Sequence, residues 1–368
     1  MTVAALDLIP YVLPLVEPVT WAGEPHRQRR GVLVRLADAE GRVGWGDAAP
    51  LPGFSRETLD DARAALDETA PVLVGRTLDA LEVVADGPFH RALDAVGLPP
   101  SARFGLDLAL ADLAAQDLGR TLPQALHPDP AVVLPLNGLI LGGDAPARAR
   151  ALARAGYRAV KLKVGRASVE ADVETAHEVR EAMPDGVALR LDANRAWSWD
   201  QALAFAHGVA GLALDYVEEP LAEPERLPEL WHDTGLAVAV DESVQEGAPI
   251  RGWASAAVLK PTLVGGVVAT LRRAAEARAV GVRPVLSASF ESGVGLRGVA
   301  ALAAATGAAP AGLDTYRWLA ADVLANAVPA GVAGAAPATR DGRLPLPLDR
   351  PQVDVPALFA HPVAVRLP

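Results

Sequence analysis

The chain has 368 residues, of which 51% are hydrophobic and none is cysteine, and its formal net charge at pH 7 is −11. This length allows one large barrel with an accessory domain, the absence of cysteine excludes disulfides and thiolate chemistry, and the negative charge argues against nucleic acid as a partner. No run of about 18 uncharged apolar residues occurs, so the sequence predicts no membrane span.

The first segment, residues 1–18, is apolar, but Asp7, Pro10 and Pro14 interrupt it and it lacks a basic start. These features indicate a strand rather than a signal peptide. Together with the absence of cysteine, they favour a cytoplasmic location.

Residues 1–100 are predicted to form an α+β capping domain. Strands are expected at 3–16 and 31–47, the latter broken near Gly41 as in a hairpin, and helices at 59–66 and 78–84. The polar segment 18–30 is predicted to be a long loop that carries an exposed Trp21. Long loops in compact domains often serve as lids, so we expect this one to cover a site.

From Ser101 the pattern becomes helical, and short apolar runs then alternate with helical windows. Such alternation favours parallel strands with helices outside them, and we predict a modified (β/α)7β TIM-type barrel over 101–315. Its strands are expected at 132–140, 159–164, 187–192, 214–219, 237–241, 256–260, 282–287 and, very short, 311–313. Residues 316–368 are predicted to be a C-terminal tail that returns to the capping domain, with strand-like runs near 343–348 and 363–367.

Lys161 and Lys163 lie in the run Ala-Val-Lys-Leu-Lys-Val. Because side chains alternate along a strand, both lysines share one face and the apolar residues occupy the other. If the apolar face packs against the helices, both ammonium groups point into the barrel. Buried ammonium groups require anionic partners.

Carboxylates follow at the ends of the next apolar runs, at intervals typical of a strand–helix–strand repeat. They are Asp192, Glu218, Glu219, Asp241 and Glu242, and Lys260 ends the run after them. The C-terminal strand ends of a parallel barrel are where active sites lie. Alternation turns Asp192, Asp241 and Arg190 inward, but it leaves open which of the two adjacent glutamates faces the interior.

Three ionised carboxylates close together repel one another unless a cation binds them. Hard oxygen ligands favour Mg²⁺, with Mn²⁺ as a substitute. A carboxylate substrate bound there would lie between lysines on opposite sides. A lysine whose pKa is lowered by nearby positive charge suits a general base, and a metal stabilises the enolate that forms.

Several motifs also carry a family resemblance: Lys-Leu-Lys at 161–163, Leu-Asp-Ala-Asn at 191–194, Val-Glu-Glu-Pro at 217–220, Val-Asp-Glu at 240–242, Leu-Lys-Pro-Thr at 259–262 and Ser-Ala-Ser-Phe-Glu-Ser at 287–292. With them the chain resembles the muconate-lactonizing-enzyme-like branch of the enolase superfamily. The segments 190–197 and 312–315 are similar to the o-succinylbenzoate synthase family within that branch. The loop 44–54 also resembles that family, with Asp47 where a Glu commonly stands.

The resemblance implies a role for each charged residue. Lys163 would remove the proton next to the substrate carboxylate and then assist loss of hydroxide, and Lys161 would lower the pKa of Lys163. Lys260 would stabilise the enolate or act as a second base. The implied Mg²⁺ ligands are Asp192, Glu218 and Asp241, and the implied substrate contacts are Ser287, Ser289, Gly312, Arg190 and Trp21.

The activity implied is dehydration of 2-succinyl-6-hydroxy-2,4-cyclohexadiene-1-carboxylate to o-succinylbenzoate in menaquinone biosynthesis. The partner would be this small carboxylate, with no nucleic acid, membrane or obligate protein partner. One alternative is an N-succinylamino acid racemase or dipeptide epimerase of the same superfamily, which would use Lys163 and Lys260 as two bases. Alternatives of other classes are a Schiff-base barrel aldolase, which needs no metal, and a non-catalytic binding barrel.

Overall fold

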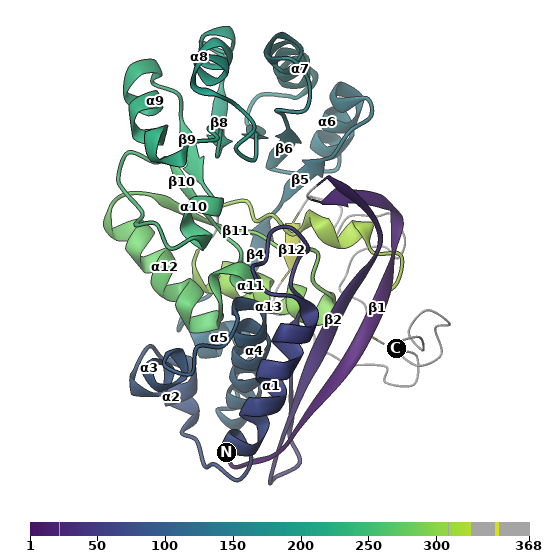
Figure 1. The fold of residues 1–368 in the computed structure, drawn as a ribbon, viewed down its shortest axis with the longest axis vertical. Helices are drawn as coiled ribbons and strands as arrows, with labels where there is room; N and C mark the ends of the chain where they lie inside the picture. The colour runs from purple at the N-terminus through teal and green to yellow at the C-terminus, as the bar shows by residue number, and fades with distance from the viewer. Residues whose placement is uncertain (22, 308, 325–342, 346–368) are drawn as a thin grey trace.

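The structure is a computed structural model, and it describes residues 1–21, 23–307, 309–324 and 343–345. Figure 1 shows a ring of short strands with helices outside it, and a cap in which long strands lie beside helices. The cap sheet has the order β1 (Val3–Trp21), β2 (Glu24–Asp38), β3 (Val43–Ala48), and neighbouring strands are antiparallel.

Helix α4 (Pro100–Asp117) is the centre of the cap, and every residue from Ser101 to Ala115 is buried. It packs against β3 on one side and against the barrel helices α11 (Pro261–Val264) and α12 (Val267–Ala279) on another. Gly46 on β3 allows backbone contact with the helix, because a Cβ there would lie 1.8 Å from the carbonyl oxygen of Gly105. Its buried charged side chains have partners, since Arg103 Nε lies 2.8 Å from Oδ1 of Asp107 and Asp112 accepts from the N–H of Trp45 at 3.0 Å.

Shorter helices complete the cap: α1 (Leu59–Leu73), α2 (Ala80–Val84), α3 (Pro88–Asp94) and α5 (Leu122–Leu126). Helix α1 begins at a capping box in which Thr58 and Asp61 bind each other's backbone N–H groups. The helices predicted at 59–66 and 78–84 correspond to α1 and α2, and α1 is longer than expected.

The barrel sheet is parallel, with the strand order β11-β10-β9-β8-β7-β6-β5. Its strands are β5 (Asn137–Ile140), β6 (Ala159–Lys163), β7 (Ala188–Asp192), β8 (Leu214–Glu218), β9 (Val238–Val240), β10 (Ala256–Leu259) and β11 (Arg283–Leu286). The helices between and after them are α6 (Ala145–Arg154), α7 (Val169–Ala182), α8 (Trp199–Gly208), α9 (Leu227–Thr234), α10 (Glu242–Gln245), α11, α12 and α13 (Gly293–Ala305), with 3-10 turns η1 (Pro224–Arg226) and η2 (Asp314–Trp318).

Two residues close the ring between its first and last strands. The N–H of Asn137 on β5 donates to Ala311 at 2.9 Å, and the N–H of Gly312 donates to Leu286 on β11 at 2.9 Å. The eighth strand predicted at 311–313 is thus present as two isolated parallel bridges. The predicted (β/α)7β barrel with an α+β cap is confirmed.

The predicted loop at 18–30 is wrong, because this segment is a strand hairpin. Strand β1 continues to Trp21, and β2 begins at Glu24 and pairs with it, after an irregularity in register between Pro14 and Val19. The polar side chains that suggested a loop are compatible with strands because the long ribbon exposes one face. Trp21 is also not exposed: its side chain is 5% accessible and its ring meets Phe290 edge-on at a centroid distance of 5.0 Å.

The predicted strand 132–140 is two strands, of which β4 (Val133–Pro135) leaves the barrel sheet and pairs with β12 (Arg343–Pro345). That part of the tail therefore joins the barrel rather than the cap. An earlier part does reach the cap, since the N–H of Ala320 donates to Pro14 at 2.8 Å. The run 363–367 lies outside the described residues, and the domain limits at 100 and 315 stay predictions.

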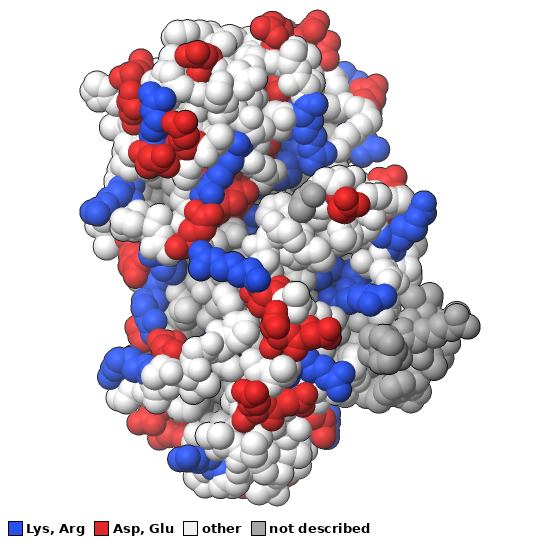
Figure 2. Space-filling view, viewed as in Figure 1, with Lys and Arg blue, Asp and Glu red and all other residues white. Residues whose placement is uncertain are grey.

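Within 1–21, 23–307, 309–324 and 343–345, no helix combines the length and the apolar character that crossing a membrane requires. Figure 2 shows acidic and basic side chains intermingled over one face of the molecule rather than gathered into a broad basic surface.

Candidate functional site

Charged side chains meet at the C-terminal ends of neighbouring barrel strands. The parallel register places Lys163, Asp192 and Glu218 side by side on β6, β7 and β8. Strands β9 and β10 end one residue before Asp241 and Lys260, which continue the same row. The three carboxyl groups have no solvent exposure.

Lys161 and Lys163 bind the first two carboxylates. The Nζ of Lys161 donates to Oε1 and Oε2 of Glu218 at 2.7 Å each and lies 2.7 Å from Oδ2 of Asp192. The Nζ of Lys163 donates to the same Asp192 oxygen at 2.5 Å and to Oδ1 of Asn194 at 2.5 Å. Both lysines thus share one carboxylate acceptor.

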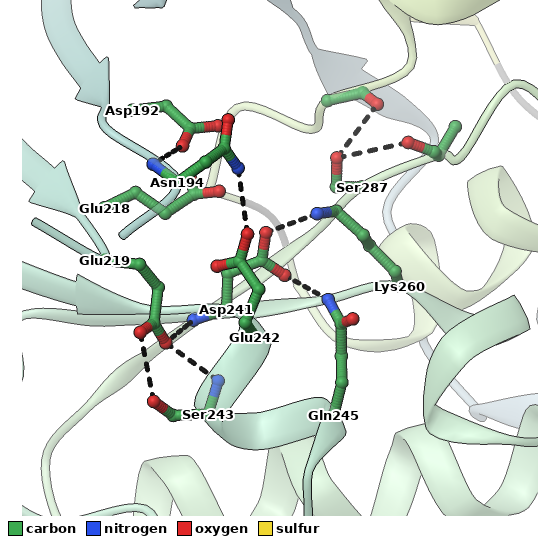
Figure 3. A network of polar contacts seen from close by, with 12 residues as sticks. Asp192, Asn194, Glu218, Glu219, Asp241, Glu242, Ser243, Gln245, Lys260 and Ser287 are labelled. Carbon is green, nitrogen blue, oxygen red and sulfur yellow. Dashed lines mark hydrogen bonds and ion pairs between the residues drawn. The ribbon is translucent and has the colours of Figure 1, made fainter. Parts of the chain in front are cut away.

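On the other side of the row, Lys260 donates to Oδ2 of Asp241 and Gln245 donates to its Oδ1. Figure 3 shows Lys260 and Gln245 both turned toward Asp241. The chain contains three lysines, Lys161, Lys163 and Lys260, and all three line one cavity. Because the chain has so few lysines, their number alone could have pointed to this site, without any argument from their spacing.

Glu219 faces away from this row, which settles the choice that strand alternation leaves open. Its Oε1 accepts from the N–H groups of Asp241 and Ser243 at 2.8 and 2.9 Å, and its Oε2 accepts from Arg195 Nε at 3.1 Å. Figure 3 shows it directed at Ser243, with Glu218 on the other side of the strand end. Its φ of 40° places Glu219 in the left-handed region, directly after the last residue of β8.

Asn194 and Glu242 also belong to the site, although the sequence reading gives them no role. The Nδ2 of Asn194 donates to Oε1 of Glu242 at 2.8 Å, so its Oδ1 is the atom left to accept from Lys163. Asn194 has a φ of 44°, in the left-handed region that asparagine enters more easily than most residues. The Leu-Asp-Ala-Asn motif is the signal that could have identified it.

The two neighbouring lysines have opposite pKa shifts. Burial lowers the pKa of Lys163 below its usual value, and the Lys161 charge lowers it further, against the attraction of Asp192. Burial also acts to lower the pKa of Lys161, but the Asp192 and Glu218 carboxylates outweigh burial and hold that pKa well above its usual value. Lys161 is therefore a fixed positive charge, whereas Lys163 loses its proton more readily.

The carboxylates form an oxygen donor set of the kind that hard divalent cations prefer. Burial raises the pKa of Glu218 well above its usual value, and the Asp192 charge raises it further. Among the described residues, no three acidic or imidazole groups stand together at metal-ligating distance. The carboxylates instead bind the ammonium groups of Lys161 and Lys260, which a bound cation would replace as counter-charges.

A cavity of about 390 Å³ lies between this row and the β1–β2 hairpin. Four of the residues predicted to touch substrate line it: Ser287, Ser289, Gly312 and Trp21. The sequence reading missed other lining residues, among them Asn137, Arg148, Arg166, Thr315 and Trp318. Thr315 belongs to the 312–315 motif, whereas the two arginines and Trp318 stand in no recognisable pattern.

Arg190 does not line this cavity, so the geometry gives no support to its predicted contact with substrate, which stays a prediction. It faces inward and is 1% exposed, but its Nε donates to Asp215 at 2.8 Å and its Nη1 to the carbonyl of Pro310 at 2.8 Å. Its guanidinium also lies 5.1 Å from the ring centroid of Tyr216. Two residues before Asp192, it occupies a deeper layer of the barrel where these groups satisfy it.

Asp47 links the cap to the barrel. Its carboxylate accepts from the hydroxyl of Tyr11 at 2.8 Å, and from the N–H and hydroxyl of Ser292 at 2.9 and 2.7 Å. Burial raises the pKa of Asp47 to about 6. Nearby, Arg29 donates to the carbonyls of Phe290 and Pro50, so this buried arginine ties the same two parts together.

Comparisons with known proteins agree with this arrangement. The model of the family "Enolase C-terminal domain-like" matches residues 144–351, and that of "MenC, N-terminal domain" matches residues 3–113. An o-succinylbenzoate synthase from Pectobacterium atrosepticum is 35% identical over 328 residues, which cover 87% of this chain and 92% of the relative.

Solved structures share the fold. The muconate lactonizing enzyme from Pseudomonas fluorescens, complexed with muconolactone, aligns with a TM-score of 0.82 at 24% identity, covering 98% of each chain. The dipeptide epimerase from Enterococcus faecalis V583, complexed with Mg and a dipeptide, aligns with a TM-score of 0.81 at 21% identity, covering 96% of this chain and 99% of the other. With its carboxylate row at the strand ends and its full-length sequence relatives, the chain belongs to the o-succinylbenzoate synthase family of the enolase superfamily.

Proposed function

We propose that this protein is an o-succinylbenzoate synthase that dehydrates 2-succinyl-6-hydroxy-2,4-cyclohexadiene-1-carboxylate. The observation that supports this most is the 35% identity to an enzyme of that name over nearly the whole length of both chains. The product ring is aromatic, so the main catalytic demand is removal of one proton next to a carboxylate. The reaction would take place in the cytoplasm, as part of menaquinone biosynthesis.

Lys163 is the proposed base. Its lowered pKa and its place on the cavity wall suit a group that must be neutral before it can accept a proton. It takes the proton from the carbon next to the carboxylate, and the same proton then leaves with the departing hydroxide as water. Lys161 keeps its charge, holds Asp192 and Glu218, and makes the Lys163 ammonium form less favourable.

Lys260 lines the cavity directly after β10, across from Lys163 on β6. Its pKa is held above the usual lysine value, because the Asp241 and Glu218 carboxylates outweigh burial. A permanently charged ammonium group there would stabilise the negative charge that develops on the substrate carboxylate when the proton leaves.

Asp192, Glu218 and Asp241 are the proposed ligands of one Mg²⁺, for which Mn²⁺ could substitute. When bound, this ion would neutralise the substrate carboxylate and stabilise the enolate. The fit rests on the donor chemistry, since these are three buried carboxylates on consecutive strand ends. Further support comes from the dipeptide epimerase of the same fold, which was solved in complex with Mg.

Ser287, Ser289 and Gly312 are proposed to contact the substrate, with Trp21 and the β1–β2 hairpin covering it. All four residues line the cavity. Covering the reacting groups excludes water and strengthens the electrostatic interactions within the site.

Racemisation of N-succinylamino acids, or epimerisation of dipeptides, is a second candidate. The presence of lysines on two opposite walls favours it, because each could exchange the α-proton on one face of a substrate. Incorporation of solvent deuterium into an amino acid substrate without inversion would argue against it. A Schiff-base aldolase would instead be trapped by borohydride and would not depend on metal.

The decisive test is a spectrophotometric assay of the purified protein with the cyclohexadiene carboxylate, first with Mg²⁺ and then with EDTA. We expect rapid loss of the diene absorbance that EDTA abolishes and Mg²⁺ restores. No turnover by folded, Mg²⁺-loaded protein would contradict the proposal, and N-succinylamino acids and dipeptides would then be assayed.

A further inference from the structure

We propose that Arg148 and Arg166 bind the second carboxylate of the substrate, the one at the end of its succinyl chain. This inference rests on the proposed function, because only that function fixes a substrate with two carboxylates. The two arginines would be specificity-determining residues, and neither would touch the reacting atoms.

The first observation concerns charge pairing among the basic residues that line the cavity. The lysines Lys161, Lys163 and Lys260 all bind carboxylates of the barrel. Arg148 and Arg166 line the same cavity, but neither has a salt bridge to another part of the chain that the structure describes. The basic groups available for a distal anion are therefore these two exposed guanidinium groups.

The second observation is that both guanidinium groups lie against one short loop. Arg148 comes from α6 and Arg166 from the loop after β6, and β6 is the neighbour of β5. The Nη1 of Arg166 donates to the carbonyl of Leu141 at 3.4 Å, a weak contact. A Cβ on Gly143 would lie 3.0 Å from Nη2 of Arg148, so the glycine leaves room for that side chain.

Figure 2 shows basic side chains gathered over β5 and β6, where the barrel meets the cap. Guanidinium groups bind carboxylates well because they present several N–H donors in a flat fork. A carboxylate between two of them would gain charge-assisted hydrogen bonds that the uncharged cavity wall cannot supply. The serines at 287 and 289 offer only hydroxyl groups.

Besides Asp192, which the lysines pair, two acidic residues line the cavity, and they limit where an anion can lie. Asp314 is neutralised locally, since Arg317 Nε lies 3.2 Å from its Oδ2 and Tyr157 donates to its Oδ1 at 2.9 Å. Glu17 on β1 is exposed and would repel a second carboxylate nearby. The anion is therefore expected on the β5–β6 side of the cavity, away from the hairpin.

The inference separates the two ends of the substrate. The carboxylate next to the reacting carbon lies with the lysines, and the succinyl carboxylate lies with the arginines. The keto group in the middle of the chain remains for the hydroxyl of Ser287, because the N–H of Gly312 already donates to Leu286. A substrate whose chain ends in a neutral group would lose only the arginine contacts.

The test compares Arg148→Gln, Arg166→Gln and the double variant with wild type, using the cyclohexadiene substrate and its derivative in which the succinyl carboxylate is a carboxamide. Arg150→Gln is the matched control, because Arg150 is exposed on the same helix but does not line the cavity. For the diacid, we expect KM to rise about ten-fold per variant, the order of one charge-assisted hydrogen bond, with kcat little changed. For the carboxamide we expect no change, and we expect Arg→Lys variants to recover part of the loss.

If the wild-type protein turns over the cyclohexadiene substrate, the proposed function stands. Equal losses on both substrates in the arginine variants, or no loss on either, would then overturn the proposed arginine subsite. Absence of wild-type turnover would instead count against the proposed function. In that case, binding of o-succinylbenzoate and its chain carboxamide is measured by calorimetry. A preference for the diacid that the double variant removes supports the subsite, and the same affinity for both ligands rejects it.

Discussion

Glu218 and Glu219 are adjacent in the chain but serve opposite sides of the barrel wall. Glu218 accepts both of its hydrogen bonds from Lys161 inside the site, whereas Glu219 accepts from backbone N–H groups at the start of α10. One residue therefore holds charge where the chemistry occurs, and its neighbour holds the loop that carries Asp241.

Changing each glutamate to glutamine is predicted to affect a different property, activity for Glu218 and stability for Glu219. Glu218→Gln should abolish Mg²⁺-dependent turnover because it removes a proposed metal ligand. It should change thermal stability little, because the lost bonds to Lys161 are offset by relief of the repulsion between Glu218 and the buried Asp192 carboxylate. Glu219→Gln should lower the free energy of unfolding by about 2 kcal/mol, the order for weakening buried hydrogen bonds to a charged group. Kinetics and thermal melts of both variants provide the measurement, and identical profiles would contradict the distinction.

Lys163→Ala should reduce kcat by a factor on the order of 10³, as expected for loss of a positioned general base. Lys260→Arg should spare dehydration more than racemisation, because only racemisation needs a second proton carrier. No surface lysine exists as a control, since the chain's three lysines all line the cavity. Arg150→Ala serves instead, and a similar loss of activity there would contradict the assignment of Lys163.

The small number of lysines permits a direct measurement of their pKa values. Protein labelled with ¹³C at lysine Cε should give three lysine resonances that can be followed through a pH titration without added divalent metal. We expect one pKa below the usual lysine value, from Lys163, and two above it, from Lys161 and Lys260. Lys163→Arg should remove the resonance with the lowest pKa. Loss of a different resonance would contradict the assignment of the lowest pKa to Lys163.

Asp47 should make the stability of the protein depend on pH. Burial raises its pKa to about 6 in the folded state, so the folded form binds more protons than the unfolded form between roughly pH 4 and 6. The contribution of this group to stability therefore falls as pH rises through that range, by about 3 kcal/mol in total. Asp47→Asn should remove this decline. The unfolding free energy of the variant should therefore increase relative to that of the wild type between pH 4 and pH 6. Chemical denaturation at several pH values measures the difference, and a constant value would contradict the prediction.

Mg²⁺ should raise the melting temperature of the wild-type protein, because a ligand that binds only the folded state stabilises it by mass action. At 100 times the dissociation constant the gain is about 2.7 kcal/mol. Asp192→Asn and Asp241→Asn should lose this stabilisation, whereas Gln245→Ala, which removes only a hydrogen bond to Asp241, should retain most of it. An equal shift in all variants would place the metal elsewhere.

The sequence predicts the barrel well because charged residues end its strands at regular intervals and alternation fixes their direction. Lys161 and Lys163 could be assigned to one face for this reason. The same argument could not separate Glu218 from Glu219, because either Tyr216 or Val217 before them could occupy the apolar face. It also turned Arg190 inward correctly but could not tell how deep in the barrel that side chain lies.

The cap was harder to predict. The segment 18–30 has the composition of a loop, and only its pairing register shows that it is a long hairpin. Arg148 and Arg166 belong to no motif, and they reach the cavity only because α6 and the loop after β6 meet there. Asn194 lay within a recognised motif, but its contact with Lys163 depends on a backbone conformation that the pattern does not reveal.

Within the part of the chain that the structure describes, Ala311 and Gly312 make the bridges that close the ring, and this seam carries none of the lysines or carboxylates that the reaction would use. Those groups lie on the consecutive strands β6 to β10, each held by its neighbour. Residues at the seam can therefore be exchanged during evolution without disturbing proton transfer. Relatives with different substrates can thus arise from one scaffold by changes in the short arc where the barrel is joined.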